Sequence, residues 1–158
     1  MIHTEVTPQA IDWNQIMGRG CPPAHGAQLI FQGLVRNHNQ GKPVLGVSYD
    51  VHPVLAAAAF QEIAQEAVAK WGEDLSIQVI HRSGRLNVGE CSLVLIVSSK
   101  HRDESYQASR YLIEQLKHRA PIWKKEHYRD GDSEWLEGHA LCGHDHDDQH
   151  SEHGGLTI

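Results

Sequence analysis

The chain has 158 residues, of which 40% are hydrophobic and 22% are charged, and this balance favours one folded domain with one core. A membrane helix needs about 20 consecutive apolar residues, and no run in the sequence approaches that length, so we expect no membrane partner. The formal net charge of −6 argues against a nucleic-acid partner.

The three cysteines, Cys21, Cys91 and Cys142, are an odd number without a C-x-x-C spacing. This usage argues against a disulfide framework and favours a reducing compartment. Residues 1–13 lack the basic region followed by an apolar stretch that is typical of a secretory signal peptide. We therefore expect a cytoplasmic protein.

The N-terminal third of the chain predicts a short helix followed by two strands. Residues 6–17 predict the helix, with Thr7 as its N-cap and Pro8 at the first helical position. After a loop rich in Gly and Pro, the apolar run 27–35 favours a strand. The alternating segment 44–51 favours a second strand, and we expect the two strands to pair antiparallel across the polar loop between them.

Two longer helices are predicted, each with an apolar stripe at helical spacing. Pro53 opens the first, which runs to Trp71, and the second runs from about Asp103 to Arg119. The stripes consist of Phe60, Ile63, Ala64, Ala67, Val68 and Trp71, and of Ser109, Leu112, Ile113 and Leu116.

Four further segments predict strands. Residues 75–84 and 91–99 are strands joined by a turn over 85–90, and residues 121–128 and 133–138 follow the second long helix. This order of helices and mostly hairpin-linked strands predicts an α+β domain. Its two main helices would pack on a mostly antiparallel or mixed sheet.

Residues 139–158 differ in composition from the rest of the chain. They contain four acids, no Lys or Arg, and too few large apolar side chains to form a core. We therefore expect a folded domain over residues 1–138 and a flexible, disordered tail over residues 139–158.

Cationic side chains cluster where apolar segments end, which is where a scaffold presents functional groups. The clusters are Arg36, His38 and Lys42; Lys100, His101 and Arg102; and Lys117, Lys124 and Lys125. The second cluster precedes a helix start, where free backbone N–H groups favour an anion. If the sheet brings these ends together, they form a pocket for a phosphate or a carboxylate.

Structural explanations for the same residues remain open at this point. Arg36 and Arg102 are equally suited to pairing with acids, and Lys117 fits a solvated helix face. Lys124 and Lys125 fit an edge strand that lysines protect from further pairing.

Three other reactive side chains are expected to be structural. His81 and Arg82 end a predicted strand, and Cys91 begins a strongly apolar one, where a buried, inert thiol is far commoner than a nucleophile. The usual nucleotide, serine-hydrolase and zinc-protease motifs are absent from the sequence.

Several segments in combination resemble the large, catalytic subunit of molybdopterin synthase. They are GLVRNHNQGK, VIHRSGRLNVGE and VSSKHRDESYQASRYLIEQLKHRAPIWKKE, followed by a Trp, and the similarity spans roughly residues 26–137. The resemblance implies an α/β-hammerhead-like fold and a sulfurtransferase of molybdenum cofactor biosynthesis. Such an enzyme converts cyclic pyranopterin monophosphate to molybdopterin by forming its dithiolene.

The resemblance also implies partners. Sulfur arrives as a thiocarboxylate on the C-terminal Gly-Gly of a small, ubiquitin-like sulfur-carrier subunit. The large subunit forms a homodimer with one small subunit at each far end, which makes a heterotetramer. No metal or organic cofactor is implied, because the donor already carries activated sulfur.

The functional positions of the family carry over one residue at a time. Matching the motifs assigns Lys117 and Lys124 as catalytic, and Arg36, His101, Arg102, His38 and Lys125 as substrate-binding, with no metal ligand. His139 stands nearest to an arginine that family members often supply to the partner protomer's pocket. The chemistry fits, because phosphate and thiocarboxylate are both anions that repel unless cations lie between them. Arginine holds phosphate oxygens with a planar fork, and lysine provides a compact charge that can also move protons.

Two alternative functions remain. A tail with His139, His144, His146, His150 and His153 among acids is typical of loose nickel, copper or zinc binding, so a metal-handling protein is one alternative. The other is a module that binds a phosphate ligand without catalysis.

Overall fold

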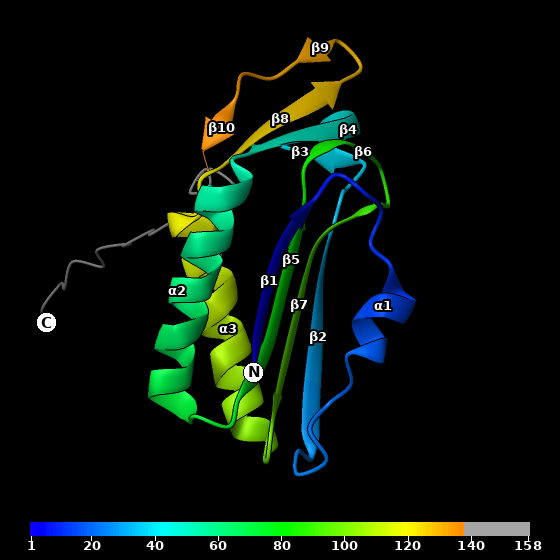
Figure 1. Ribbon diagram of the computed structural model, residues 1–158. Coiled ribbons are helices and arrows are strands. Elements are labelled where there is room, and N and C mark those ends of the chain that lie inside the picture. Colours follow the sequence, from blue (N-terminus) through cyan, green and yellow to red (C-terminus); the bar gives the residue numbers. More distant parts are fainter. Residues whose placement is uncertain (138–158) are drawn as a thin grey trace, which may run out of the picture.

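Two β-sheets and three helices form the described part of the chain, residues 1–137, in the computed structural model (Figure 1). In chain order the elements are β1 (Ile2–Thr7), α1 (Trp13–Gly18), β2 (Ala27–Leu34), β3 (His38–Asn39), β4 (Lys42–Val51), α2 (Pro53–Trp71), β5 (Ser76–Arg82), β6 (Gly84–Asn87), β7 (Cys91–Ser99), α3 (Arg102–Arg119), β8 (Ile122–Tyr128), β9 (Gly131–Asp132) and β10 (Leu136–Glu137). None of these helices combines the length and hydropathy that a membrane-spanning segment requires. The predicted boundary after residue 138, the predicted tail and His139 lie outside the described residues.

The first sheet has four strands in the order β1-β5-β7-β2. Strand β1 runs parallel to β5, and the other two pairs are antiparallel, so the sheet is mixed. Helices α2 and α3 pack on one face of this sheet, and Ile16 of α1 packs on the other face against Ile80, Val94 and Ile96. Strands β5 and β7 are therefore covered on both faces, which explains the continuous apolar run of β7 and the complete burial of β5.

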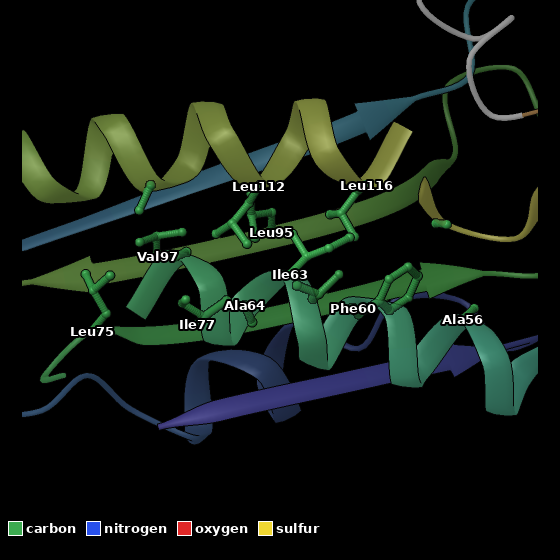
Figure 2. Packing of buried hydrophobic residues seen from close by; sticks show 14 of the residues in the cluster. Ala56, Phe60, Ile63, Ala64, Leu75, Ile77, Leu95, Val97, Leu112 and Leu116 are labelled. Atoms are coloured by element: carbon green, nitrogen blue, oxygen red, sulfur yellow. The ribbon is translucent and has the colours of Figure 1, made fainter. Parts of the chain in front are cut away.

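The main core lies between the first sheet and the helices α2 and α3 (Figure 2). Phe60 and Ile63 of α2 and Leu112 of α3 are fully buried, and burying one such side chain contributes roughly 1.5–3 kcal/mol. Smaller residues on the same helix faces, Ala64 and Ala108, are also fully buried and allow the helices to approach the sheet closely.

The second sheet has six strands, with the path β10-β8-β4-β3 and with β6 paired to β4 and β9 paired to β8. Its inner face carries Val44, Val47 and Leu86, which form a smaller core cluster with Val35. In Figure 1 this sheet lies at the end of the molecule where α3 ends and β8 begins.

The structure confirms the α+β class and the two main helices. Pro53 is at the first position of α2, where its missing N–H costs nothing, and His52 caps the helix by accepting from the backbone N–H of Leu55. The four apolar residues Phe60, Ile63, Ala64 and Ala67 of the predicted stripe are buried.

The predicted start of the N-terminal helix, at residue 6, is wrong. Residues Ile2–Thr7 form strand β1, and the helix begins only at Trp13, with Asp12 as its N-cap. Asp12 accepts from the backbone N–H of Gln15, a role that the prediction gave to Thr7. Strand β1 hydrogen-bonds to the open edge of the buried strand β5, and local sequence preferences do not reveal such a distant partner.

Two strand predictions also need correction. Strands β2 and β4 do not pair with each other, because β2 pairs with β7 in the first sheet and β4 pairs with β6 and β8 in the second. The predicted turn over residues 85–90 contains most of strand β6, whose Leu86 is fully buried.

Candidate functional site

Strand β8 places Lys124 and Lys125 on opposite faces of the second sheet. Lys124 lies opposite Tyr49 of β4 on the inner face, where the neighbouring Glu126 is buried. Lys125 lies opposite Ser48 on the outer face, with its ammonium nitrogen 4.7 Å from the centre of the Trp135 ring. The two lysines therefore do not line one common wall.

A buried ion pair holds Lys124 in place. Its Nζ is 2.8 Å from Oε1 of Glu126, and the two side chains are 16% and 4% exposed. Glu126 also accepts from Asn39 Nδ2 at 2.7 Å and from the Tyr128 hydroxyl. Burial alone would raise the pKa of Glu126, but the hydrogen bonds from Lys124 and Tyr128 outweigh it and hold that pKa below its ordinary value. Glu126 is therefore charged at neutral pH, and the Lys124 ammonium group has a fixed partner.

Sequence reasoning missed Glu126, Asn39 and Tyr128 as parts of this site. The signal for Glu126 was available, because residues two apart on a strand share a face and Glu126 follows Lys124 by two. Asn39 reaches Glu126 from strand β3, far away in the sequence, so only the fold reveals that contact.

The same contact joins the first cationic cluster to Lys124. Arg36 and His38 closely precede Asn39 in the chain, and both are exposed. The imidazole Nδ1 of His38 lies 2.9 Å from Asn37 Oδ1, and the Lys42 ammonium nitrogen lies 5.5 Å from the centre of the Tyr128 ring. Arg36, His38 and Lys42 therefore lie at the Lys124 end of the molecule.

The remaining predicted residues lie at the two opposite ends of helix α3. Lys117 is in its last turn, close to where the chain enters β8, whereas Arg102 begins the helix and His101 is its N-cap. With a rise of about 1.5 Å per residue, Arg102 and Lys117 are about 22 Å apart along the helix axis. Figure 1 shows α3 running along one face of the first sheet, so that its two ends lie at opposite ends of that sheet. One copy of the chain thus gathers Arg36, His38, Lys117 and Lys124 at one end, and His101 and Arg102 at the other.

The cations differ in whether an acid neutralises them. Arg119 is held by Glu66 at 2.7 Å and Glu62 at 3.2 Å. Within residues 1–137, no ion pair involves Arg36, Arg102 or Lys117. These three side chains remain available to an anionic ligand.

The three side chains that were expected to be structural have structural surroundings. Arg82 is buried and pairs with Glu90 at 2.9 Å, and the imidazole Nδ1 of His81 donates to the carbonyl oxygen of Arg82. Burial raises the pKa of the Cys91 thiol, which disfavours the thiolate that a nucleophile requires.

Comparison with known proteins points to one family. The model of the MoaE protein family matches residues 6–119. A molybdopterin synthase catalytic subunit from Synechococcus elongatus is 48% identical over 118 residues, covering 75% of this chain and 72% of that protein. Another, from Halalkalibacterium halodurans, is 39% identical over 127 residues, covering 80% and 81%.

Solved structures agree with the sequence comparison. Molybdopterin synthase from Staphylococcus aureus superposes with a TM-score of 0.78 at 30% identity, covering 84% of this chain and 95% of that one. A chain in the complex of subunits 1 and 2 of molybdopterin-converting factor from Helicobacter pylori shares the fold, with a TM-score of 0.65 at 22% identity, covering 83% of this chain and 87% of that one.

Proposed function

The chain belongs to the MoaE family, and from this premise we propose that it is the catalytic subunit of a molybdopterin synthase. It transfers sulfur from the thiocarboxylated C-terminus of a small, ubiquitin-like carrier protein to cyclic pyranopterin monophosphate. The observation that carries the proposal is a set of cations, Arg36, Arg102 and Lys117, that have no acidic partner within residues 1–137. Arg36 and Lys117 lie at the end of the chain that holds the fixed ammonium group of Lys124, and Arg102 lies at the other end. The complex of two subunits in the Helicobacter pylori relative supports a small partner protein. The cysteine usage supports a cytoplasmic location.

The reaction needs positive charge because its two reactants repel each other. The substrate carries a cyclic phosphate, and the donor carries a thiocarboxylate. Arg36 holds phosphate oxygens through its guanidinium group, and Lys117 and Lys124 stabilise the charge that develops when sulfur attacks the pterin side chain. The acyl link to the carrier is then hydrolysed, and a second carrier delivers the second sulfur. Lys125, on the outer face of the sheet, lies away from this centre.

A homodimer completes the site, because one copy holds its cations at two separate ends. Among the strands that the structure describes, β2 is an edge strand of the first sheet, and it exposes the large apolar side chains Ile30, Phe31 and Leu34. A free edge with exposed apolar residues is suited to pairing with another strand. The occupant we propose is β2 of a second copy, which fits the two-fold symmetry of most soluble dimers.

The geometry of β2 explains why this pairing would join the two halves of the site. Its first end lies beside His101 and Arg102, because the N–H of Gly26 donates to the carbonyl of Lys100 at 3.2 Å. Its other end leads directly to Arg36. Antiparallel pairing about a two-fold axis places the start of one β2 beside the end of the other. Arg36 and Lys117 of one copy would then face His101 and Arg102 of its partner. A small carrier protein on each far end makes a heterotetramer.

Turnover with a thiocarboxylated carrier protein tests the function. Purified chain, carrier and cyclic pyranopterin monophosphate are expected to yield the dithiolene product, which is measured after oxidation to a fluorescent pterin. Lys117→Ala should lower the rate about a hundredfold, because one pre-placed charge is commonly worth ~3 kcal/mol in the transition state.

Arg110→Ala is the matched control on the same helix, because Arg110 is exposed and, among residues 1–137, pairs only with Glu114, four residues along α3. It should keep the wild-type rate. Deletion of residues 139–158 should also leave the rate of dithiolene formation unchanged. A metal-handling protein that used these residues would lose its metal binding with them. Lys117→Ala with unchanged turnover would remove Lys117 from the mechanism.

A further inference from the structure

A chain of hydrogen bonds joins a serine, a histidine and an aspartate on the outer face of the second sheet. The imidazole Nε2 of His127 is 2.7 Å from Ser48 Oγ, and its Nδ1 is 2.8 Å from Asp132 Oδ1. The bond from His127 holds the pKa of Asp132 below its ordinary value, so Asp132 is a carboxylate that accepts from Nδ1–H. The other ring nitrogen is then free to accept the proton of the Ser48 hydroxyl.

Three separate strands build this arrangement. Ser48 is in β4, His127 is in β8 and Asp132 is in the short strand β9, which pairs back onto β8 with Asp132 opposite His127. His127 is buried and its orientation is fixed from both sides, whereas Ser48 retains partial exposure. No sequence motif marks the group, because its members are held together only by strand register.

Two cations flank the Ser48 hydroxyl. Arg85 of β6 and Lys125 of β8 are the residues directly opposite Ser48 on its two neighbouring strands. Directly opposite residues of an antiparallel pair have their Cβ atoms about 4.5–5.5 Å apart on the same face. The charges of Lys125 and Arg85 also help to lower the pKa of Asp132, which places both cations within electrostatic reach of the group.

We propose that Ser48 is an activated nucleophile that acts on small anionic acyl esters. His127 is the general base, Asp132 orients it, and Arg85 and Lys125 receive the negative charge of the substrate and of the developing oxyanion. A hydroxyl bonded to a histidine that is itself oriented by a carboxylate is the arrangement that activates a serine. Guanidinium and ammonium groups stabilise oxyanion charge in the same way as other hydrogen-bond donors.

The reaction is an ester hydrolysis with a covalent intermediate. Ser48 Oγ forms a bond to the acyl carbon, the ester C–O bond breaks, and His127 takes the serine proton and gives it to the leaving oxygen. Water then attacks the acyl carbon of the acyl-serine, and His127 accepts its proton. The bond between the acyl carbon and Ser48 Oγ breaks, His127 returns the proton to Oγ, and the carboxylic acid leaves. The reaction needs no oxidant or reductant.

This second site is independent of sulfur transfer. Residues alternate between the faces of a strand, so Lys124 and Glu126 lie on the inner face of the sheet and Lys125 and His127 on the outer face. A variant of one site therefore leaves the other intact.

Covalent labelling tests the nucleophile directly in the unmodified protein. A fluorophosphonate probe should modify Ser48, as located by peptide mass spectrometry, and labelling should be lost in Ser48→Ala and in His127→Ala. Ser83→Ala is the control serine variant and should label as wild type. The proposal is overturned if wild-type Ser48 stays unmodified, or if His127→Ala, still cooperatively folded in a thermal melt, labels at the wild-type rate.

Two nitrophenyl esters test the role of the cations. Arg85→Gln should lower the hydrolysis rate of mono-4-nitrophenyl glutarate, which is anionic, about tenfold more than that of neutral 4-nitrophenyl acetate, because both esters lose oxyanion stabilisation but only the anionic ester also loses a partner for its carboxylate. Equal effects on both esters would contradict the selectivity for anions. Ser48→Ala should keep sulfur transfer, and Lys117→Ala should keep fluorophosphonate labelling.

Discussion

Lys124 extends from a strand into a largely buried environment, and an ammonium group in such a place needs a partner. Glu126 supplies it from the same face of β8, and Asn39 and Tyr128 satisfy the other oxygen of that carboxylate. This network orients the amine of Lys124, and neither Arg36 nor Lys117 takes part in it. Glu126 is thus a positioning residue for the proposed reaction.

Replacing Glu126 with Ala should destabilise the protein measurably. Removing one member of a buried ion pair leaves the other charge without compensation, and we expect the free energy of unfolding to fall by about 3 kcal/mol in urea denaturation at pH 7. Glu134→Gln, at an exposed acid, is the control and should change it by less than about 0.5 kcal/mol. A Glu126→Ala protein as stable as wild type would show that the pair does not hold Lys124.

His81 should make stability depend on pH between its two protonation limits. Burial lowers its pKa from 6.5 to about 4, so between these values the unfolded chain binds a proton that the folded chain does not. Stability is therefore complete above pH 6.5 and falls as the pH drops towards 4, by about 3 kcal/mol over the whole interval. His81→Gln should flatten this part of the profile in denaturant titrations; an unchanged slope would assign the loss to other groups.

Helices α2 and α3 are tied together by one carboxylate. Glu66 of α2 accepts from Arg119 at 2.7 Å and from the Tyr111 hydroxyl, both on α3. The hydrogen bond from Arg119, with that from Tyr111, lowers the pKa of Glu66 from 4.5 to about 2. The contact lies near the last turn of α3, so it also fixes the end of the helix that carries Lys117.

The acid limb of stability should report this helix contact. The folded-state pKa of Glu66 lies below its unfolded value, so its contribution is complete above pH 4.5 and is lost as the pH falls towards 2. Glu66→Gln should weaken the pH dependence in that interval in thermal melts. Glu73→Gln, an exposed acid after α2, should retain it, and equal profiles for Glu66→Gln and wild type would contradict the contact.

Elements whose signals are local were predictable from the sequence. The bounds of α2 follow from Pro53 and its apolar stripe, and α3 follows in the same way from its own. Pairings between distant segments were not. Strand β1 forms only by pairing with β5, which is distant in the sequence. Strand β2 pairs with β7 and not with β4, the next long strand in the chain. The reason is that burial of strand faces across the whole fold decides which strands pair.

The candidate site was also predictable only where its signals are local in the sequence. Motifs predicted Arg36, Lys117 and Lys124 as site residues, whereas the Lys124–Glu126 pair and its contact with Asn39 depend on strand register. Pattern alone also grouped Lys125 with Lys124, although alternation along β8 turns the two apart. The Ser48–His127 contact joins strands far apart in the sequence and left no motif to find.

At the scale of the whole molecule, the distribution of cations is the main feature. Arg36 and Lys117 lie at one end of the first sheet and Arg102 at the other, and the free edge strand β2 spans the distance between them (Figure 1). Pairing of β2 across a two-fold axis would form two equivalent sites, each with residues from both copies. We therefore propose that the reaction, which joins two anions, requires this dimer.

Complementation between two inactive variants tests this claim most directly. Lys117→Ala and Arg102→Ala should each be nearly inactive alone, because each removes one half of every site. Co-expressed, they should recover about a quarter of the wild-type rate of dithiolene formation, since about half of the dimers are mixed and each mixed dimer has one intact site. A mixture no more active than the separate variants, although mixed dimers are present by native mass spectrometry, would contradict a site shared between two copies.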